Sequence, residues 1–157
     1  MDSDTKLYLE RAGNELKLAE IIMQMSINKD LQTKIPAIDK PDTYFSSVIS
    51  HAYYSIFYTA KAYLIMKGII TKAPEEHKKT YDEFRRLVSQ GIVDKELLRL
   101  YEEVLVKAEE LLGIFKIEKK KRGEFTYQRI AQANLEPAKE SLDNAKTFLK
   151  NIYDLCV

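Results

Sequence analysis

The segment Tyr44–Lys67, YFSSVISHAYYSIFYTAKAYLIMK, decides the fold of this 157-residue chain. It contains neither Gly nor Pro, and its apolar residues recur at steps of three and four, which is the spacing of one face of an α-helix. That spacing predicts a central helix with one broad buried face. The residues predicted to form this face are Phe45, Val48, Ile49, Ala52, Tyr53, Ile56, Phe57, Ala60, Tyr63 and Leu64.

A second row of the same segment is polar and consists of Ser47, His51, Tyr54, Tyr58 and Lys61. A helix with one apolar face and one hydroxyl-rich face lies between a core and something polar, such as water, a partner subunit or a ligand. The simpler interpretation is that the tyrosines are packing residues whose hydroxyls reach water. The two rows together offer more apolar and aromatic surface than one small domain must cover, which predicts a two-fold homodimer.

The rest of the chain also has helical periodicity. Gly68 predicts the end of the central helix, and Asp42 or Thr43 is predicted to cap its start. The connector 28–43 holds Pro36 and Pro41 and is predicted to contain at most a short helical turn. Further helices are predicted at about 5–26, 74–91, 94–113 and 135–154. We therefore predict one all-α domain spanning residues 1–157, an up-and-down bundle of four to five helices.

Composition narrows the possible functions. The net charge of +1 indicates no general affinity for nucleic acid or membranes, so any electrostatic site must be local. The single cysteine, Cys156, excludes an internal disulfide framework, and with only two histidines a metal site is not expected. We predict no cofactor. No apolar run approaches the ~20 residues of a membrane span, so the expected location is the cytoplasm.

Charge is concentrated in one segment, Lys116–Arg129, KIEKKKRGEFTYQR, which has six basic residues against two acidic ones. Aromatic residues are interleaved with the bases, a mixture that can hold phosphates by charge and nucleobases by stacking. The alternative is a solvated, lysine-rich loop. Candidate binding residues are therefore Lys119, Lys120, Lys121, Arg122, Phe125 and Tyr127, together with Tyr54 and Tyr58 of the central segment.

The order of these features resembles the HEPN family (higher eukaryotes and prokaryotes nucleotide-binding). The resemblance covers nearly the whole chain and is carried by YLERAGNELKLAE, SHAYYSIFYTAKAYL, the following KGI, EEHKKTYDEF, KKRGEFTYQ and EPAKESLDNAKTFLKNI. It implies a four- or five-helix up-and-down bundle that commonly forms a homodimer. It also implies nucleotide or RNA binding, and many catalytically active members resemble toxins paired with a minimal nucleotidyltransferase antitoxin.

Active members of the family resemble metal-independent endoribonucleases, in which an arginine is followed four to six residues later by a histidine. Here the matching arginine is Arg122, and Tyr127 stands where the histidine is expected. Tyrosine titrates near pH 10 and is a poor proton shuttle at neutral pH. Three hypotheses follow: a non-catalytic binding module, a toxin-type ribonuclease in which His51 or His77 replaces the missing imidazole, or a homodimeric interaction protein.

Overall fold

The computed structural model describes residues 1–117 and 134–157, and this part of the chain forms six helices and no strand. The helices are α1 (Ser3–Ile27), α2 (Lys29–Thr33), α3 (Phe45–Met66), α4 (Glu76–Ser89), α5 (Lys95–Leu112) and α6 (Leu135–Cys156). The predicted all-α class is confirmed. Each predicted helix is present with ends shifted by a few residues, and the short α2 is the helical turn expected in the first connector.

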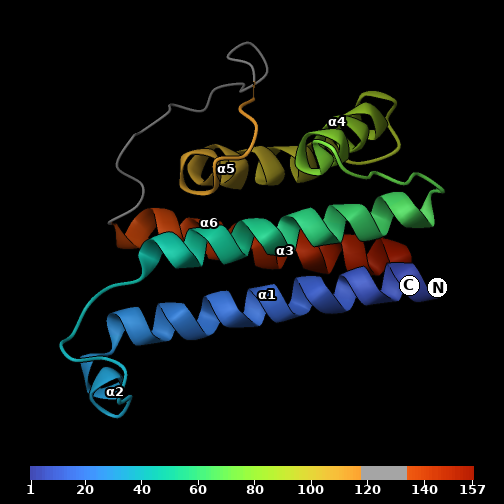
Figure 1. Cartoon of the computed structure of the whole chain (residues 1–157). Coiled ribbons are helices and arrows are strands. Elements are labelled where there is room, and N and C mark those ends of the chain that lie inside the picture. Colours follow the sequence, from blue (N-terminus) through green and yellow to red (C-terminus); the bar gives the residue numbers. More distant parts are fainter. Residues whose placement is uncertain (118–133) are drawn as a thin grey trace.

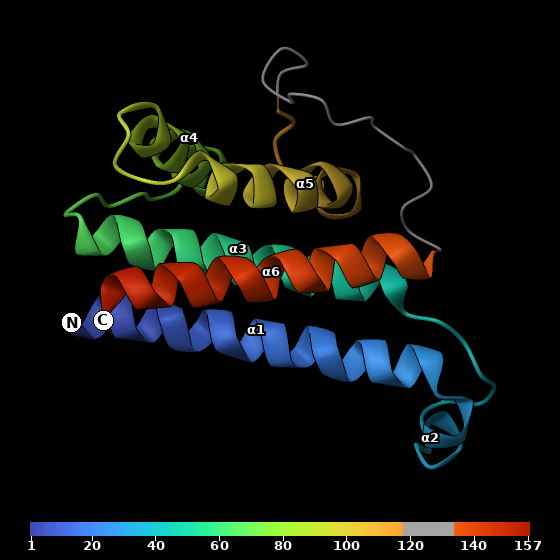
Figure 2. The same cartoon turned by 180° about the vertical axis from the view of Figure 1, so that it is seen from behind.

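The helices form three layers around α3 (Figure 1). α1 is one outer layer, α3 and α6 form the middle layer, and α4 and α5 cover the other side (Figures 1 and 2). α1 and α5 run in one direction, while α3 and α6 run in the other. α3 contacts α1, α4, α5 and α6, and all ten residues of its predicted apolar face are buried. The central role predicted for this segment is therefore confirmed.

Glycines end α3 and α4 in the same way. Gly68 and Gly91 have φ angles of 78° and 73°, in the left-handed region that glycine adopts without a Cβ clash. The residue after each glycine donates its amide back across the last turn, from Ile69 to Leu64 O at 2.8 Å and from Ile92 to Leu87 O at 3.0 Å. This pattern satisfies carbonyls that a helix end otherwise leaves without partners. The predicted stop at Gly68 is confirmed.

The predicted cap of α3 is wrong. Neither Asp42 nor Thr43 caps the helix, because the residue that precedes α3 is Tyr44 and its own side chain makes no capping hydrogen bond. The backbone amide of Tyr44 instead donates to Ser26 Oγ at 2.8 Å. The start of α3 is thus fixed by the end of α1, through a contact between residues that are distant in sequence.

The connector between α1 and α3 is fastened by one buried amide side chain. Gln32 is 1% exposed, and its Nε2 donates to Met25 O at 2.6 Å and to Asp42 O at 2.8 Å. The backbone amide of Asp42 donates to Gln32 Oε1 at 2.9 Å. Because a buried amide is costly unless it is hydrogen-bonded, these three bonds hold the two ends of the connector together.

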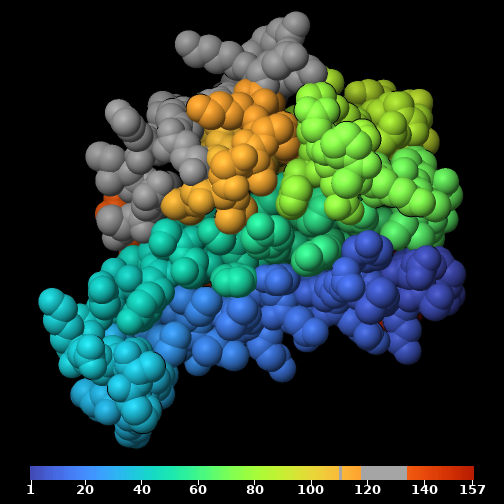
Figure 3. Space-filling view, in the orientation of Figure 1, coloured from blue at the N-terminus to red at the C-terminus, as the bar shows by residue number. Residues whose placement is uncertain are grey.

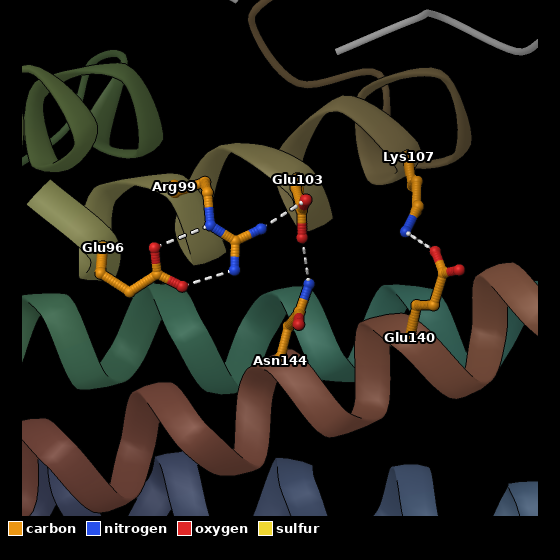
Figure 4. Close-up of polar contacts among 6 residues, drawn as sticks. All are labelled: Glu96, Arg99, Glu103, Lys107, Glu140 and Asn144. Atoms are coloured by element: carbon orange, nitrogen blue, oxygen red, sulfur yellow. Dashed lines mark hydrogen bonds and ion pairs between the residues drawn. The ribbon is translucent and has the colours of Figure 1, made fainter. Parts of the chain in front are cut away.

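Polar side chains join α5 to α6 (Figure 4). Within α5, Arg99 bridges the carboxylates of Glu96 and Glu103. From α6, Asn144 Nδ2 donates to Glu103 Oε2 at 2.7 Å, and a second link of 3.0 Å joins Lys107 Nζ to Glu140 Oε2. Pairs of this kind that water reaches contribute little free energy. Their effect is to set how α6 lies along α5.

No helix in the described ranges combines the length and the apolarity that crossing a bilayer requires.

Candidate functional site

The main cluster of candidate functional side chains lies where α1 meets α3. Figure 3 shows the face on which these two helices lie side by side. The ring centroids of Tyr54 and Tyr58 on α3 are 6.4 Å apart, and the ring of Tyr58 is 5.9 Å from that of Tyr8 on α1. The guanidinium carbon of Arg11 lies 5.3 Å from the centroid of Tyr8 and 5.9 Å from that of Tyr58. We call Tyr8, Arg11, Tyr54 and Tyr58 the tyrosine strip.

The strip forms because small residues let α1 and α3 pack closely. Ala12, Ala19 and Ala52 have no exposed surface, and Ser55 Oγ donates to the carbonyl of Ala12 at 2.9 Å across the interface. Larger side chains at the edge of this interface must therefore lie over it. The three tyrosines are half-buried and Arg11 is exposed, so the strip is a surface that a ligand can reach.

An acid and an imidazole extend the strip by one turn of α3. Nδ1 of His51 lies 2.6 Å from Oε2 of Glu15 on α1, and the two side chains are 28% and 26% exposed. A carboxylate bound to one ring nitrogen fixes the orientation of an imidazole, which is how many general bases are held. The same carboxylate acts on Tyr58, because burial first and then the negative charge of Glu15 raise the pKa of that phenol. Tyr58 is therefore a neutral hydrogen-bond donor.

His77 is held in a more enclosed position at the start of α4. Its ring stacks on Phe57 with a centroid distance of 4.0 Å, and its Nδ1 lies 2.9 Å from the hydroxyl of Tyr53. Its ring is steeply inclined to that of Tyr54, at 68°, and the two ring centroids are 6.0 Å apart. Burial lowers the pKa of His77, an effect that the carboxylate of Glu76 opposes and the ammonium of Lys61 reinforces. His77 thus packs at the end of the strip as a neutral aromatic group.

Lys61 was predicted in the polar row of α3, but its side chain is only 5% exposed. Nζ donates to Thr71 O at 3.0 Å and to the carboxylate of Glu76, and lies 4.9 Å from the ring centroid of Tyr8. These residues line an open pocket of about 400 Å³ at the Tyr8 end of the strip. The lysine fastens the connector after α3 to the core, and its charge is already paired.

The residues of the polar row of α3 therefore fall into two groups, one at the surface and one inside the protein. Tyr54, Tyr58 and His51 belong to the exposed strip or its extension, whereas Lys61 is internal. His77 reaches the same neighbourhood from α4 through its contact with Tyr54. The other candidates, Lys119, Lys120, Lys121, Arg122, Phe125 and Tyr127, lie outside the described residues.

Sequence reasoning missed the contribution of the first helix. Tyr8, Arg11 and Glu15 recur at steps of three and four, so they share one side of α1. That spacing was a usable signal for a polar and aromatic row. The sequence alone does not predict how α1 is rotated about its axis, and this rotation turns the row toward Tyr58 and His51.

No family model matches the chain, and no curated protein matches it. The chemistry of the α1–α3 site and the resemblance described above are what bear on function.

Proposed function

We propose that the protein is a nucleotide- or RNA-binding module of HEPN type that does not cleave its ligand. The observation that carries this proposal is the tyrosine strip. Half-buried aromatic rings at the surface offer stacking surfaces to bases of any sequence, and a guanidinium beside them can hold a phosphate by paired hydrogen bonds. In Arg11, Tyr8 and Tyr58 these two groups lie within 6 Å of each other.

In this proposal the basic residues around Arg122 contribute further phosphate contacts, because the charges of Glu15 and Arg11 oppose each other at Tyr58. The proposal includes the assembly that the resemblance implies: a homodimer in the cytoplasm that works beside a small nucleotidyltransferase. The alternative is that the protein binds no ligand and acts only as an interaction protein through its dimer surface.

One observation favours a second candidate, a metal-independent endoribonuclease. Such a reaction needs a base for the 2′-hydroxyl proton and a cation for the phosphorane. The Glu15–His51 pair has the form of an oriented base, and it lies one helical turn from Tyr54 in the strip. Arg11 would supply the cation. In this candidate His51, and not the enclosed His77, takes the role of the missing histidine.

The test is fluorescence anisotropy with a labelled single-stranded RNA at low salt. Tyr58→Ala should weaken binding by about 1–3 kcal/mol, the usual value of one base stacked on an aromatic ring. Tyr153→Ala is the matched control, because Tyr153 is 48% exposed on α6, outside the strip. Equal affinities of wild type and Tyr58→Ala would refute the strip as the binding surface, provided circular dichroism shows both proteins folded.

A second arm of the same experiment tests the basic segment. Replacing Lys119, Lys120 and Lys121 together with Ala should weaken RNA binding and flatten its salt dependence, because fewer phosphate contacts release fewer counterions. The melting temperature should stay nearly unchanged. An unaltered salt slope would show that these lysines only face water.

A further inference from the structure

The outward face of α1 carries an apolar row that the described helices leave uncovered. Leu7, Leu18 and Ile21 are 43%, 40% and 47% exposed. Their positions on the helix lie opposite the buried residues Ala12 and Met23. On the side of α1 away from α3 and α6, Figures 1 and 2 show no described element except the short α2 at the C-terminal end of α1. Clustered exposed apolar residues of this kind usually mark an interface.

The spacing of this row indicates what covers it. Residues 7, 11, 14, 18, 21 and 25 follow one another at steps of four and three, the repeat of a helix that packs along another helix. Apolar residues fill four of the six positions. We call this row the α1 seam, and its members are Leu7, Arg11, Asn14, Leu18, Ile21 and Met25.

We propose that the α1 seam pairs antiparallel with the α1 seam of a second copy of this chain. Charges beside the seam favour this occupant and this direction. Glu10 and Lys17 are exposed on the same flank, so an antiparallel two-fold pair centred near residue 14 places each Glu10 beside Lys17 of the second copy. A parallel pair would instead place Glu10 beside Glu15 of the second copy, which is repulsive.

The same register accounts for the apolar and polar positions of the seam. Leu7 packs against Leu18 and Ile21 of the second copy, and two-fold symmetry makes this contact twice. Asn14 falls at the centre, where one polar residue fixes the register of paired helices at some cost in stability. Arg11 leans out of the seam, since its guanidinium lies over the rings of Tyr8 and Tyr58.

The pairing also has a consequence for the ligand, and this step rests on the proposed function. In an antiparallel pair, equivalent flanks of the two helices meet on the same side. The flank of α1 that holds Tyr8 and Glu15 is the one turned toward α3. The two tyrosine strips therefore lie next to each other on one face of the dimer. The substrate class that fits is a single strand long enough to cross both strips.

The first experiment is light scattering on the full chain at micromolar concentration. Wild type should have the mass of a dimer, and Leu18→Glu should have the mass of a monomer. Ile92→Glu is the matched control, because Ile92 is 50% exposed but lies outside α1, and this variant should remain dimeric. A monomeric wild type, or a dimeric Leu18→Glu, overturns the proposal.

Charge exchange tests the direction of the pair. Lys17→Glu alone should weaken the dimer, because it then faces Glu10 of the second copy. Adding Glu10→Lys to the same chain should restore the dimer, since both contacts become attractive again. Failure of the double variant to recover would overturn the antiparallel register even if wild type is dimeric.

RNA binding separates failure of this inference from failure of the proposed function. With a length series of labelled RNA, Leu18→Glu should lose affinity for long strands and keep it for short ones. A dimer that binds no RNA of any length would support the α1 seam and refute the proposed function. A wild-type monomer that binds RNA through Tyr58 would refute the α1 seam and the proposed homodimer, but RNA binding by the tyrosine strip would be supported.

Discussion

The carboxylate of Glu15 on α1 lies 2.6 Å from the imidazole Nδ1 of His51 on α3, and this pair joins the two helices beside the tyrosine strip. Both side chains are roughly a quarter exposed, so water reaches the pair and limits its strength. The contact therefore orients the imidazole more than it stabilises the fold.

A double-mutant cycle with Glu15→Gln and His51→Gln measures this pair. We expect a coupling free energy of about 0.2–1 kcal/mol from urea unfolding, because water reaches both side chains and weakens their interaction. The control is the exposed pair Lys78–Asp82 on α4, which should give a smaller value. A coupling near zero would show that the Glu15–His51 contact does not persist in solution.

His77 makes stability depend on pH. Burial lowers its pKa in the folded protein, so the unfolded chain binds the proton more readily. Stability is therefore greatest above the unfolded value of about 6.5 and falls as the pH drops from there toward the lowered folded pKa. Urea unfolding at pH 7.5 and 5.5 should show a larger loss for wild type than for His77→Gln. Equal losses would mean that the ring is not held in its neutral form.

Tyr101 on α5 is fully buried, and within the described part of the chain its hydroxyl has no hydrogen-bond partner. Tyr101→Phe removes that unsatisfied group and should raise the free energy of unfolding by about 1 kcal/mol. Tyr81→Phe is the opposite control, because the hydroxyl of Tyr81 donates to the buried Glu102 at 3.1 Å. That variant should lose stability. A destabilised Tyr101→Phe would point to a partner for its hydroxyl.

The proposed absence of cleavage has its own test. Purified wild type should not cleave RNA at neutral pH, because Tyr127 is a phenol where the family pattern has an imidazole. Tyr127→His should create weak cleavage, and adding Arg122→Ala should abolish it. Gel assays with a labelled RNA measure both outcomes. Wild-type cleavage that disappears in His51→Ala would instead support the ribonuclease candidate and identify its base.

The sequence was sufficient for features that depend on local pattern. The apolar period of Tyr44–Lys67 identified the buried face of α3, and Gly68 and Gly91 marked helix ends because their conformations are local. The predicted cap of α3 was wrong because Ser26, eighteen residues before Tyr44, accepts the hydrogen bond from the Tyr44 amide. Half of the tyrosine strip was missed for a similar reason. α1 is apolar toward the core and along its outer face, so its sequence does not show which side meets α3.

The three hydrogen bonds of Gln32 also bear on the order in which the protein folds. They close the connector between α1 and α3, two long helices separated only by the connector that holds α2. α1 and α3 share the most extensive contact between helices in the described chain. Contacts between near neighbours cost little loop-closure entropy, so this hairpin can form early. α6 must join it from the far end of the chain. We expect mutations in the α1–α3 interface to slow folding in stopped-flow kinetics, and mutations where α6 meets α5 mainly to speed unfolding.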